Sequence, residues 1–262
     1  MATISLPQVS TDTGRPNIER YDGDLEQDAA LFKTIKSCNS VIGSLSNPSK
    51  MPGWSTSLPA SMCRTGSKLS KIPGTVCFGC YAADDWGWLN QPGRKSRYSN
   101  YAFPAVRDSL RKRLDALADP KWVPAMVSMI RKRCDKDTPF RWHDSGDIQS
   151  LEHLENICAV CEATPDVKHW IPTREYHDVD AYLEKHGKEP DNLAIRVSAH
   201  RVNQRAPKRF ELTSMVIDGF GLGVIRAPDD VFECPAYKQG GKCGECRACW
   251  DKTIPTTVYP LH

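Results

Sequence analysis

The spacing of hydrophobic residues predicts an alternation of helices and strands from about residue 98 onward. Apolar residues from Val106 to Leu117 recur every three or four positions, as on one face of a helix, and a second such stripe follows Asp119-Pro120. Further along, the pattern predicts strands over 139–147, 167–172, 192–200, 213–220 and 223–227, with helices over 150–162 and 177–187. Strands that alternate with helices in this way are typical of parallel βαβ units.

This pattern divides the chain into three parts. Residues 1–50 are polar and rich in proline, glycine and serine, which predicts an N-terminal arm with at most a short helix. Residues 51–230 are expected to form an α/β domain, whose first strand runs from Trp54 into a cysteine loop over 63–80. With about six strands, the domain fits an open or partial (β/α)6-type barrel better than a closed eightfold one. Residues 231–262 form a cysteine-rich C-terminal extension.

Length and composition narrow the class of protein. A chain of 262 residues can bury a hydrophobic core without disulfide bonds. It has no apolar run long enough to span a bilayer and no signal-peptide pattern at its start, so we expect a cytoplasmic protein without membrane association. The net charge of +3 is too small to indicate nucleic-acid binding. Because disulfides are rare in the cytosol, the eleven cysteines indicate metal binding.

The strongest metal motif lies near the C-terminus, where four cysteines have the spacing C-x8-C-x2-C-x2-C. They are Cys234, Cys243, Cys246 and Cys249. Gaps of two residues let successive thiolates turn toward one ion or cluster, and the nearby glycines leave room for that turn. Four thiolates suit either Zn²⁺ or an iron–sulfur cluster, and the CxxCxxC triplet favours [4Fe–4S]. Disulfides or unbound thiols are the alternative.

A second cysteine group has the spacing C-x13-C-x2-C in the loop after the first strand. Its members are Cys63, Cys77 and Cys80. Three ligands leave one position of a metal centre open for a substrate or cofactor, unless Cys38 supplies the fourth. Cys158 and Cys161 also form a CxxC, but they lie on the apolar face of a predicted helix and are expected in the core, like Cys134.

A three-cysteine loop after the first strand, followed by repeated βα units, resembles the radical S-adenosylmethionine (SAM) enzymes. In that superfamily three cysteines, usually spaced C-x3-C-x2-C and followed by an aromatic residue, hold a [4Fe–4S] cluster whose fourth iron binds SAM. Here the C-x2-C and Tyr81 match, whereas the gap of thirteen residues departs from the usual form. The resemblance implies reductive cleavage of SAM to a 5′-deoxyadenosyl radical, with an auxiliary cluster on the C-terminal cysteines.

The resemblance also implies SAM-binding residues at the ends of two later strands. Ser145, Gly146 and Asp147 stand where the superfamily has a Gly-Gly-Glu-like motif for the amino group of SAM. Glycine permits close backbone approach and a carboxylate can accept from an ammonium, although Asp147 could instead cap the next helix. Polar residues at the end of the 192–200 strand alternate onto one face, where superfamily members contact the carboxylate and ribose; an ordinary polar strand face is the alternative. They are Arg196, Ser198 and His200.

At the scale of the whole chain, five segments within residues 40–262 resemble the phage "gene product 88" family. They contain MPGWSTSLPASMC, RWHDSGDIQSLEHL, WIPTREY, IRVSAH and CPAYKQGGKCGECRACWD. This resemblance implies a phage-encoded protein of the host cytoplasm and names no reaction. With the cysteines, it leads to the hypothesis of a radical SAM-type iron–sulfur protein that acts on an unknown substrate and takes electrons from a separate donor.

The competing hypothesis is a non-catalytic iron–sulfur or zinc protein that binds nucleic acid or a host protein. Two short segments, 94–101 and 205–210, mix basic and aromatic residues as in surfaces that stack bases and contact phosphates. Short basic runs of this kind are also common on solvated surfaces.

Overall fold

Seven parallel strands form one open sheet in the computed structural model, which describes residues 14–80, 82, 101, 103–219 and 230–261. They are β1 (Trp54–Ser55), β2 (Phe140–Arg141), β3 (His169–Thr173), β4 (Leu193–Ser198), β5 (Thr213–Ile217), β6 (Phe232–Glu233) and β7 (Thr256–Pro260). Their order is β1-β2-β3-β4-β5-β7-β6, with β1 and β6 as the two edges. The α/β class is therefore confirmed, and the sheet formed by the described residues does not close.

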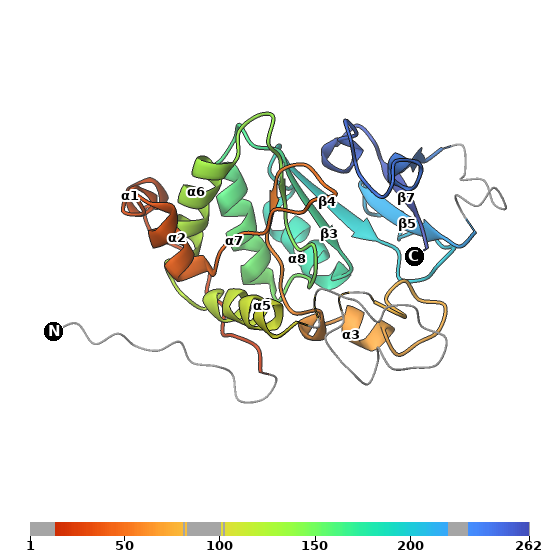
Figure 1. The fold of residues 1–262 in the computed structure, drawn as a ribbon, viewed down its shortest axis with the longest axis horizontal. Helices are drawn as coiled ribbons and strands as arrows, with labels where there is room; N and C mark the ends of the chain where they lie inside the picture. The colour runs from red at the N-terminus through yellow and green to blue at the C-terminus, as the bar shows by residue number, and fades with distance from the viewer. Residues whose placement is uncertain (1–13, 81, 83–100, 102, 220–229, 262) are drawn as a thin grey trace.

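The longer helices gather on one face of this sheet (Figure 1). The helices are α1 (Leu25–Ala30), α2 (Ile35–Ile42), α3 (Gly66–Leu69), α5 (Pro104–Ala116), α6 (Trp122–Arg133), α7 (Leu151–Glu162) and α8 (Tyr176–His186). Right-handed crossovers between strands that are neighbours in sequence place successive helices on the same side. Helix α6 packs against α1, α2 and α7, and α7 packs against α8, so the core lies between this helical layer and the sheet.

The elements expected between residues 98 and 219 are present, with shifted ends. Helix α7 begins after Ser150, whose hydroxyl accepts the backbone N–H of His153, and α8 ends at Gly187, which has a φ of +81°. Strand β2 has two residues, because the chain turns at His143 (φ +56°) toward the sheet edge. The strand expected over 223–227 lies outside the described residues.

Part of the expected N-terminal arm belongs to the folded domain. Helices α1 and α2 pack on α6, and Phe32, Cys38 and Ile42 are buried there. Both helices are short, but Ile35, Cys38 and Ile42 of α2 have the three- and four-residue spacing of an apolar helix face, which is the sequence signal for a helix in this arm.

The C-terminal segment also joins the sheet, because β7 lies between β5 and β6. The cysteine-rich turn between β6 and β7 contains two short 3-10 helices, η3 (Pro235–Lys238) and η4 (Ala248–Trp250), and it packs over the sheet face opposite the long helices (Figure 1). The Trp250 ring packs edge-on against Trp170 of β3 with 5.2 Å between centroids, and its indole N–H donates to the Phe140 carbonyl (2.9 Å). The sheet is thus covered on both faces.

Candidate metal centres

The first cysteine loop lies at the edge of the sheet where the parallel strands end. It leaves β1, passes the 3-10 helix η1 (Ala60–Met62) and α3, and forms a short antiparallel bridge to the residues after β4. Arg64 forms an ion pair with Asp178 of α8 (2.7 Å), and Thr65 donates to the Glu175 carboxylate through its backbone N–H and its hydroxyl. The loop is therefore held across the ends of β1, β3 and β4.

This loop brings the thiols of Cys63 and Cys77 beside Gly66, and Cys80 acts on Cys63 electrostatically. A Cβ at Gly66 would lie 3.5 Å from the Cys77 sulfur and 3.6 Å from the Cys63 sulfur, so any side chain there would occupy the space beside the thiols. Cys80 follows in a turn closed by a backbone hydrogen bond to Cys77 (3.1 Å). Burial raises the pKa of the Cys63 thiol well above its ordinary value, and Asp147 and the other two thiols raise it further.

Asp147 joins the end of β2 to the end of β3 beside these thiols. Its carboxylate accepts hydrogen bonds from the Thr173 hydroxyl (2.6 Å) and from the backbone N–H groups of Arg174 (2.9 Å) and Ile148 (2.8 Å). Burial raises the pKa of Asp147 to about 6, although these hydrogen bonds oppose the shift. Helix α7 is capped by Ser150, so Asp147 does not have the capping role that was its alternative.

Ser145 and Gly146 hold the turn that carries Asp147. The Ser145 hydroxyl donates to the Leu58 carbonyl (2.8 Å), and the Leu58 N–H donates to the Ser145 carbonyl (2.9 Å). Gly146 has a φ of +80°, and a Cβ there would lie 2.6 Å from the Leu58 Cβ. Glycine is the residue that accommodates both this conformation and this approach.

Arg174 is a basic residue at the same edge that no cysteine or glycine motif indicated. The Asp147 carboxylate and the thiolate forms of the three cysteines attract its guanidinium, and among the described residues its buried Nε has no hydrogen-bond partner. Burial lowers the pKa of Arg174, but these attractions outweigh burial and the pKa is raised overall. Its position directly after a parallel strand is the sequence signal that could have identified it.

Two of the three polar residues expected at the end of β4 reach this edge. Ser198 is buried as the last residue of β4. The His200 ring stacks on Tyr176 with 4.0 Å between centroids, and its Nε2 lies 3.1 Å from the Arg174 carbonyl oxygen. Arg196 lies two residues earlier and is engaged with the C-terminal segment instead.

The four C-terminal cysteines also lie near one another. Cys234 and Cys246 each act electrostatically on Cys243, and Cys234 acts on Cys249. The fully buried Arg196 guanidinium holds their turn by donating to four backbone carbonyls at 2.7–2.9 Å. These carbonyls belong to Ala248, Cys249, Asp251 and Ile254.

The remaining cysteines lie in the hydrophobic core. Cys158 and Cys161 are buried on α7, as the apolar stripe predicts, and Cys134 is buried at the end of α6. Cys38, the alternative fourth ligand of the first group, is 0 % exposed on α2. Figure 1 places α2 in the helical layer, on the opposite side of the molecule from α3 and the cysteine loop.

A family-level comparison agrees with the whole-chain resemblance. The model of the family described as Gene product 88 matches residues 25–252. The chain belongs to the Gene product 88 family. The match to this phage gene-product family spans both cysteine groups and the first six strands. No curated protein and no solved structure matches the chain significantly.

The described part of this Gene product 88 protein has no ready-made site for a single metal ion. Within it, no three His, Cys, Asp or Glu side chains converge closely enough to hold one ion together. The two cysteine groups are therefore sets of neighbouring thiols that do not meet at one point.

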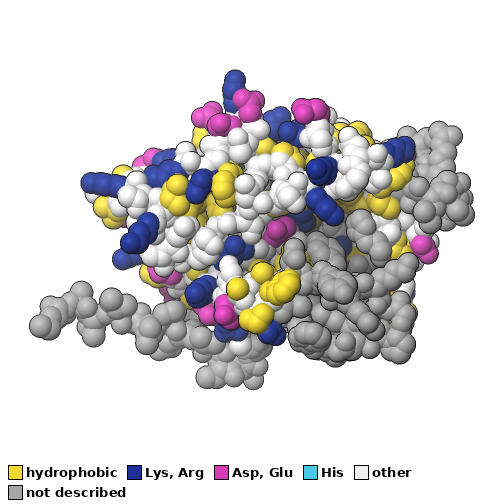
Figure 2. Space-filling model, viewed as in Figure 1, with side chains coloured by type: hydrophobic (Ala, Val, Ile, Leu, Met, Phe, Trp, Pro, Cys, Tyr) yellow, Lys and Arg dark blue, Asp and Glu magenta, His cyan; other side chains and the backbone are white. Residues whose placement is uncertain are grey.

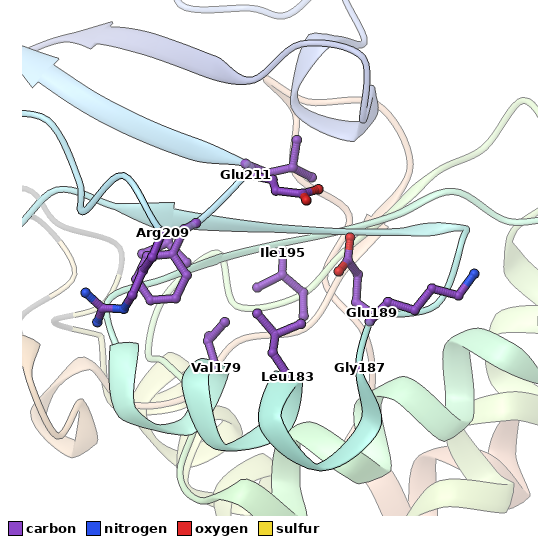
Figure 3. A pocket seen from close by; sticks show the side chains of 11 residues that line it. Val179, Leu183, Gly187, Glu189, Ile195, Arg209 and Glu211 are labelled. Atoms are coloured by element: carbon purple, nitrogen blue, oxygen red, sulfur yellow. The ribbon is translucent and has the colours of Figure 1, made fainter.

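A small cavity lies away from both groups, between α8 and the segment before β5 (Figure 3). It has a volume of about 150 Å³. Val179, Leu183 and Ile195 form an apolar floor, and Glu189 and Arg209 lie at its rim (Figure 3). It contains none of the cysteines and none of the residues expected to bind SAM, but Arg209 and Phe210 of the second basic segment line it.

The second basic segment is partly paired with acidic side chains in the described part of the chain. Figure 2 shows basic side chains scattered among acidic ones on the face in view. Arg205 and Arg209 of the second basic segment form ion pairs with Asp230 and Asp180, while residues 94–100 of the first lie outside the described ranges. A search of the described helices finds none with the length and apolarity that a membrane crossing needs.

Proposed function

We propose that this Gene product 88 protein is an iron–sulfur protein of the radical SAM type. In this proposal Cys63, Cys77 and Cys80 hold a [4Fe–4S] cluster, and SAM binds the iron that has no cysteine ligand. The observation that carries the proposal is the grouping of these three thiols with Asp147 and Arg174 at the edge where the parallel strands end. Parallel α/β proteins build their active sites at this edge.

The arrangement of the thiols suits a cluster better than a zinc ion. A zinc site needs its donors about 2.0–2.3 Å from one point, whereas each thiolate of a [4Fe–4S] cluster binds a different iron. Neighbouring thiols that do not converge on one point, two of them beside the space that Gly66 leaves free of a side chain, are compatible with the second requirement. The cationic Arg174 offsets part of the negative charge that the thiols acquire as ligands.

The position of Cys38 supports an iron without a protein thiolate. Because Cys38 is buried among core residues on α2, it cannot act as a fourth ligand without unpacking the helical layer. The first group therefore has three cysteines in its own loop, and the described residues offer no fourth cysteine that could join them as a ligand. This is the ligand number that leaves a coordination position for a small molecule.

Residues of the chain could then bind and orient SAM around that position. Asp147 offers a carboxylate that can accept from an ammonium group, and the turn of Ser145 and Gly146 fixes it in place. Ser198 and His200, at the end of β4, supply polar groups on the neighbouring strand. When bound, the reduced cluster supplies the electron that cleaves SAM, and the C-terminal cysteines hold an auxiliary cluster.

An electron donor is the partner that this activity requires. The outer face of the first cysteine loop exposes Lys68 and Lys71 beside the apolar side chains of Ile72 and Phe78. A basic rim around apolar contacts suits a transient complex with an acidic electron carrier of the host cytoplasm.

Anaerobic purification, iron and sulfide analysis, and addition of SAM to the reduced protein test the proposal. We expect about four irons in the first group and the formation of 5′-deoxyadenosine. The double variant Cys77→Ala/Cys80→Ala should lose both. The control Cys158→Ala/Cys161→Ala removes an equally spaced pair from the core and should keep both.

Two results would count against the proposal in different ways. Iron content that is unchanged in Cys77→Ala/Cys80→Ala would contradict a cluster at the first group. A cluster that yields no 5′-deoxyadenosine and no SAM-dependent spectral change would support the non-catalytic iron–sulfur alternative.

A further inference from the structure

The second cysteine group lies over two arginines that have no carboxylate bonded to them among the described residues. Arg196 in β4 is 0 % exposed, and all four of its hydrogen bonds go to backbone carbonyls. Asp251 is a carboxylate that acts on it electrostatically, but less strongly than Tyr259 and Cys249, and it accepts hydrogen bonds from the Thr253 backbone N–H (2.9 Å) and hydroxyl (2.7 Å). Burial lowers the pKa of Arg196, which shows the cost of keeping this charge away from water.

Arg141 in β2 is the second of these arginines. It stacks on Trp170 at 4.7 Å from the ring centroid, and its Nη1 lies 2.8 Å from the thioether sulfur of Met51. Its buried Nε has no hydrogen-bond partner in the described part of the chain. Arg141 acts electrostatically on Cys243 and Cys249. The register Arg141↔Trp170 and the alternation along β3 and β4 place Arg141 and Arg196 on the same sheet face.

These two arginines, Arg196 fully buried and Arg141 half-buried, are here called the cationic floor, and an anion beside them would offset the cost of removing their charges from water. Buried charges are costly unless an opposite charge compensates them, and protonated thiols carry none. Four thiolates bound to Zn²⁺ or to an oxidised [4Fe–4S] cluster form a dianion in either case. A dianion above two guanidinium groups makes the buried site electrically neutral. Arg247, at the outer side of the turn, adds a third attraction for Cys243.

The Tyr259 hydroxyl is oriented to donate a hydrogen bond to the sulfur of Cys249. Its hydroxyl oxygen accepts from the Thr257 hydroxyl (3.1 Å), so its own hydrogen is free to point to the Cys249 sulfur, which lies 3.1 Å away. A sulfur that accepts from a buried hydroxyl is stabilised as a thiolate. Partners of this kind, which contact the ligands and not the metal, commonly set the affinity and potential of a metal centre.

We propose that Arg141, Arg196 and Tyr259 provide a preformed environment for a dianionic metal centre with four thiolate ligands. The ligands of this centre are Cys234, Cys243, Cys246 and Cys249. The inference rests on the part of the proposed function that assigns metal to these cysteines, and it does not depend on SAM. Arg196 positions the turn that carries the ligands, and Arg141 and Tyr259 stabilise their negative charge. The metal centre on the C-terminal cysteines is therefore held rigidly against the sheet and has all four of its ligands from the protein. The first cysteine group is the one that leaves a coordination position open.

The test uses a background in which only the second group can bind metal. The Cys63→Ala/Cys77→Ala/Cys80→Ala variant, purified anaerobically, should keep one metal centre, whether zinc or iron–sulfur. In this background Arg141→Gln should weaken metal retention against EDTA by about 10–100-fold, as is typical for residues that support metal ligands. Arg141→Lys should retain most of the affinity, because it keeps the charge.

Arg133→Gln is the matched control. Arg133 also stacks on a tryptophan, with its guanidinium 4.5 Å from the Trp54 ring centroid, but it is exposed at the end of α6. It should leave metal retention unchanged. If Arg141→Gln does not fold, Tyr259→Phe removes one hydroxyl at nearly constant volume and should still speed metal loss.

The outcomes separate this inference from the proposed function. A background variant without metal overturns the inference, as does an Arg141→Gln or Tyr259→Phe variant that holds metal as tightly as Arg133→Gln. The proposed function is judged on the reciprocal Cys243→Ala/Cys246→Ala variant, through the iron of the first group. Either idea can therefore fail while the other stands.

Discussion

Replacing Gly146 by alanine tests whether the turn after β2 is built to hold Asp147 beside the first thiols. The new Cβ would lie 2.6 Å from the Leu58 Cβ and 2.9 Å from the Leu58 carbonyl oxygen. The left-handed conformation costs a residue with a side chain about 1–2 kcal/mol, and overpacking against a buried neighbour costs about 1–3 kcal/mol. We therefore expect the free energy of unfolding to fall by roughly 2–5 kcal/mol.

Gly187 offers a control with the same substitution at nearly the same positive φ. Its φ is +81°, and nothing lies within 4 Å of an added Cβ. Gly187→Ala should therefore show the conformational cost of about 1–2 kcal/mol alone. The difference between the two variants isolates the contact of Gly146 with Leu58.

Urea unfolding followed by tryptophan fluorescence measures this difference, and the alkylation rate of Cys63 in the folded protein reports whether the turn has moved. Equal destabilisation by the two substitutions would refute the reasoning, because Leu58 would then move away from the new methyl group without any loss of stability. A larger loss in Gly146→Ala with unchanged Cys63 reactivity would show that the turn supports the fold and does not position Asp147 against the thiols.

Three further outcomes are expected. Arg196→Lys should lower the free energy of unfolding by about 1.5–3 kcal/mol in a thermal melt, because one ammonium cannot reach all four carbonyls. Burial lowers the pKa of His153 and of His169 to about 3, so the unfolded chain takes up protons below about pH 6.5 while the folded one does not. The free energy of unfolding should therefore fall as the pH drops, by about 1.4 kcal/mol per histidine at pH 5.5. Urea titrations at several pH values should show a weaker dependence of this free energy on pH in His153→Gln/His169→Gln, and an unchanged dependence would contradict this origin. Cys38→Ala should cost roughly 1 kcal/mol in a urea titration and leave the iron of the first group intact; loss of that iron would identify Cys38 as a ligand.

The sequence predicts best what local chemistry determines. Helices α7 and α8 follow from an apolar stripe together with Ser150 at one start and Gly187 at one end. The parallel sheet follows from the alternation of these helices with strands. The grouping of Cys63 with Cys77 and Cys80 follows from a single loop, so spacing alone is informative.

What the sequence does not predict depends on contacts between distant segments. The alternation of Arg196 with Ser198 suggests one polar face at one site, but the C-terminal turn folds back over the middle of β4 and takes Arg196 away from the strand end. Strand β6 has two residues, too few to show a period. The sequence places Arg174 at the end of a strand, but its nearness to the thiols follows only from the position of β3 beside the cysteine loop.

The place of β7 inside the sheet gives the C-terminal cysteine turn a role in keeping the protein from aggregating. All five residues of β5, from Thr213 to Ile217, are in register with β7, and β6 pairs with β7 on its other side. If the turn opened and released β7, β5 would become a bare edge with Met215 and Ile217 uncovered. An unpaired apolar edge is a template for strands of other chains, so damage to these cysteines should first be seen as self-association.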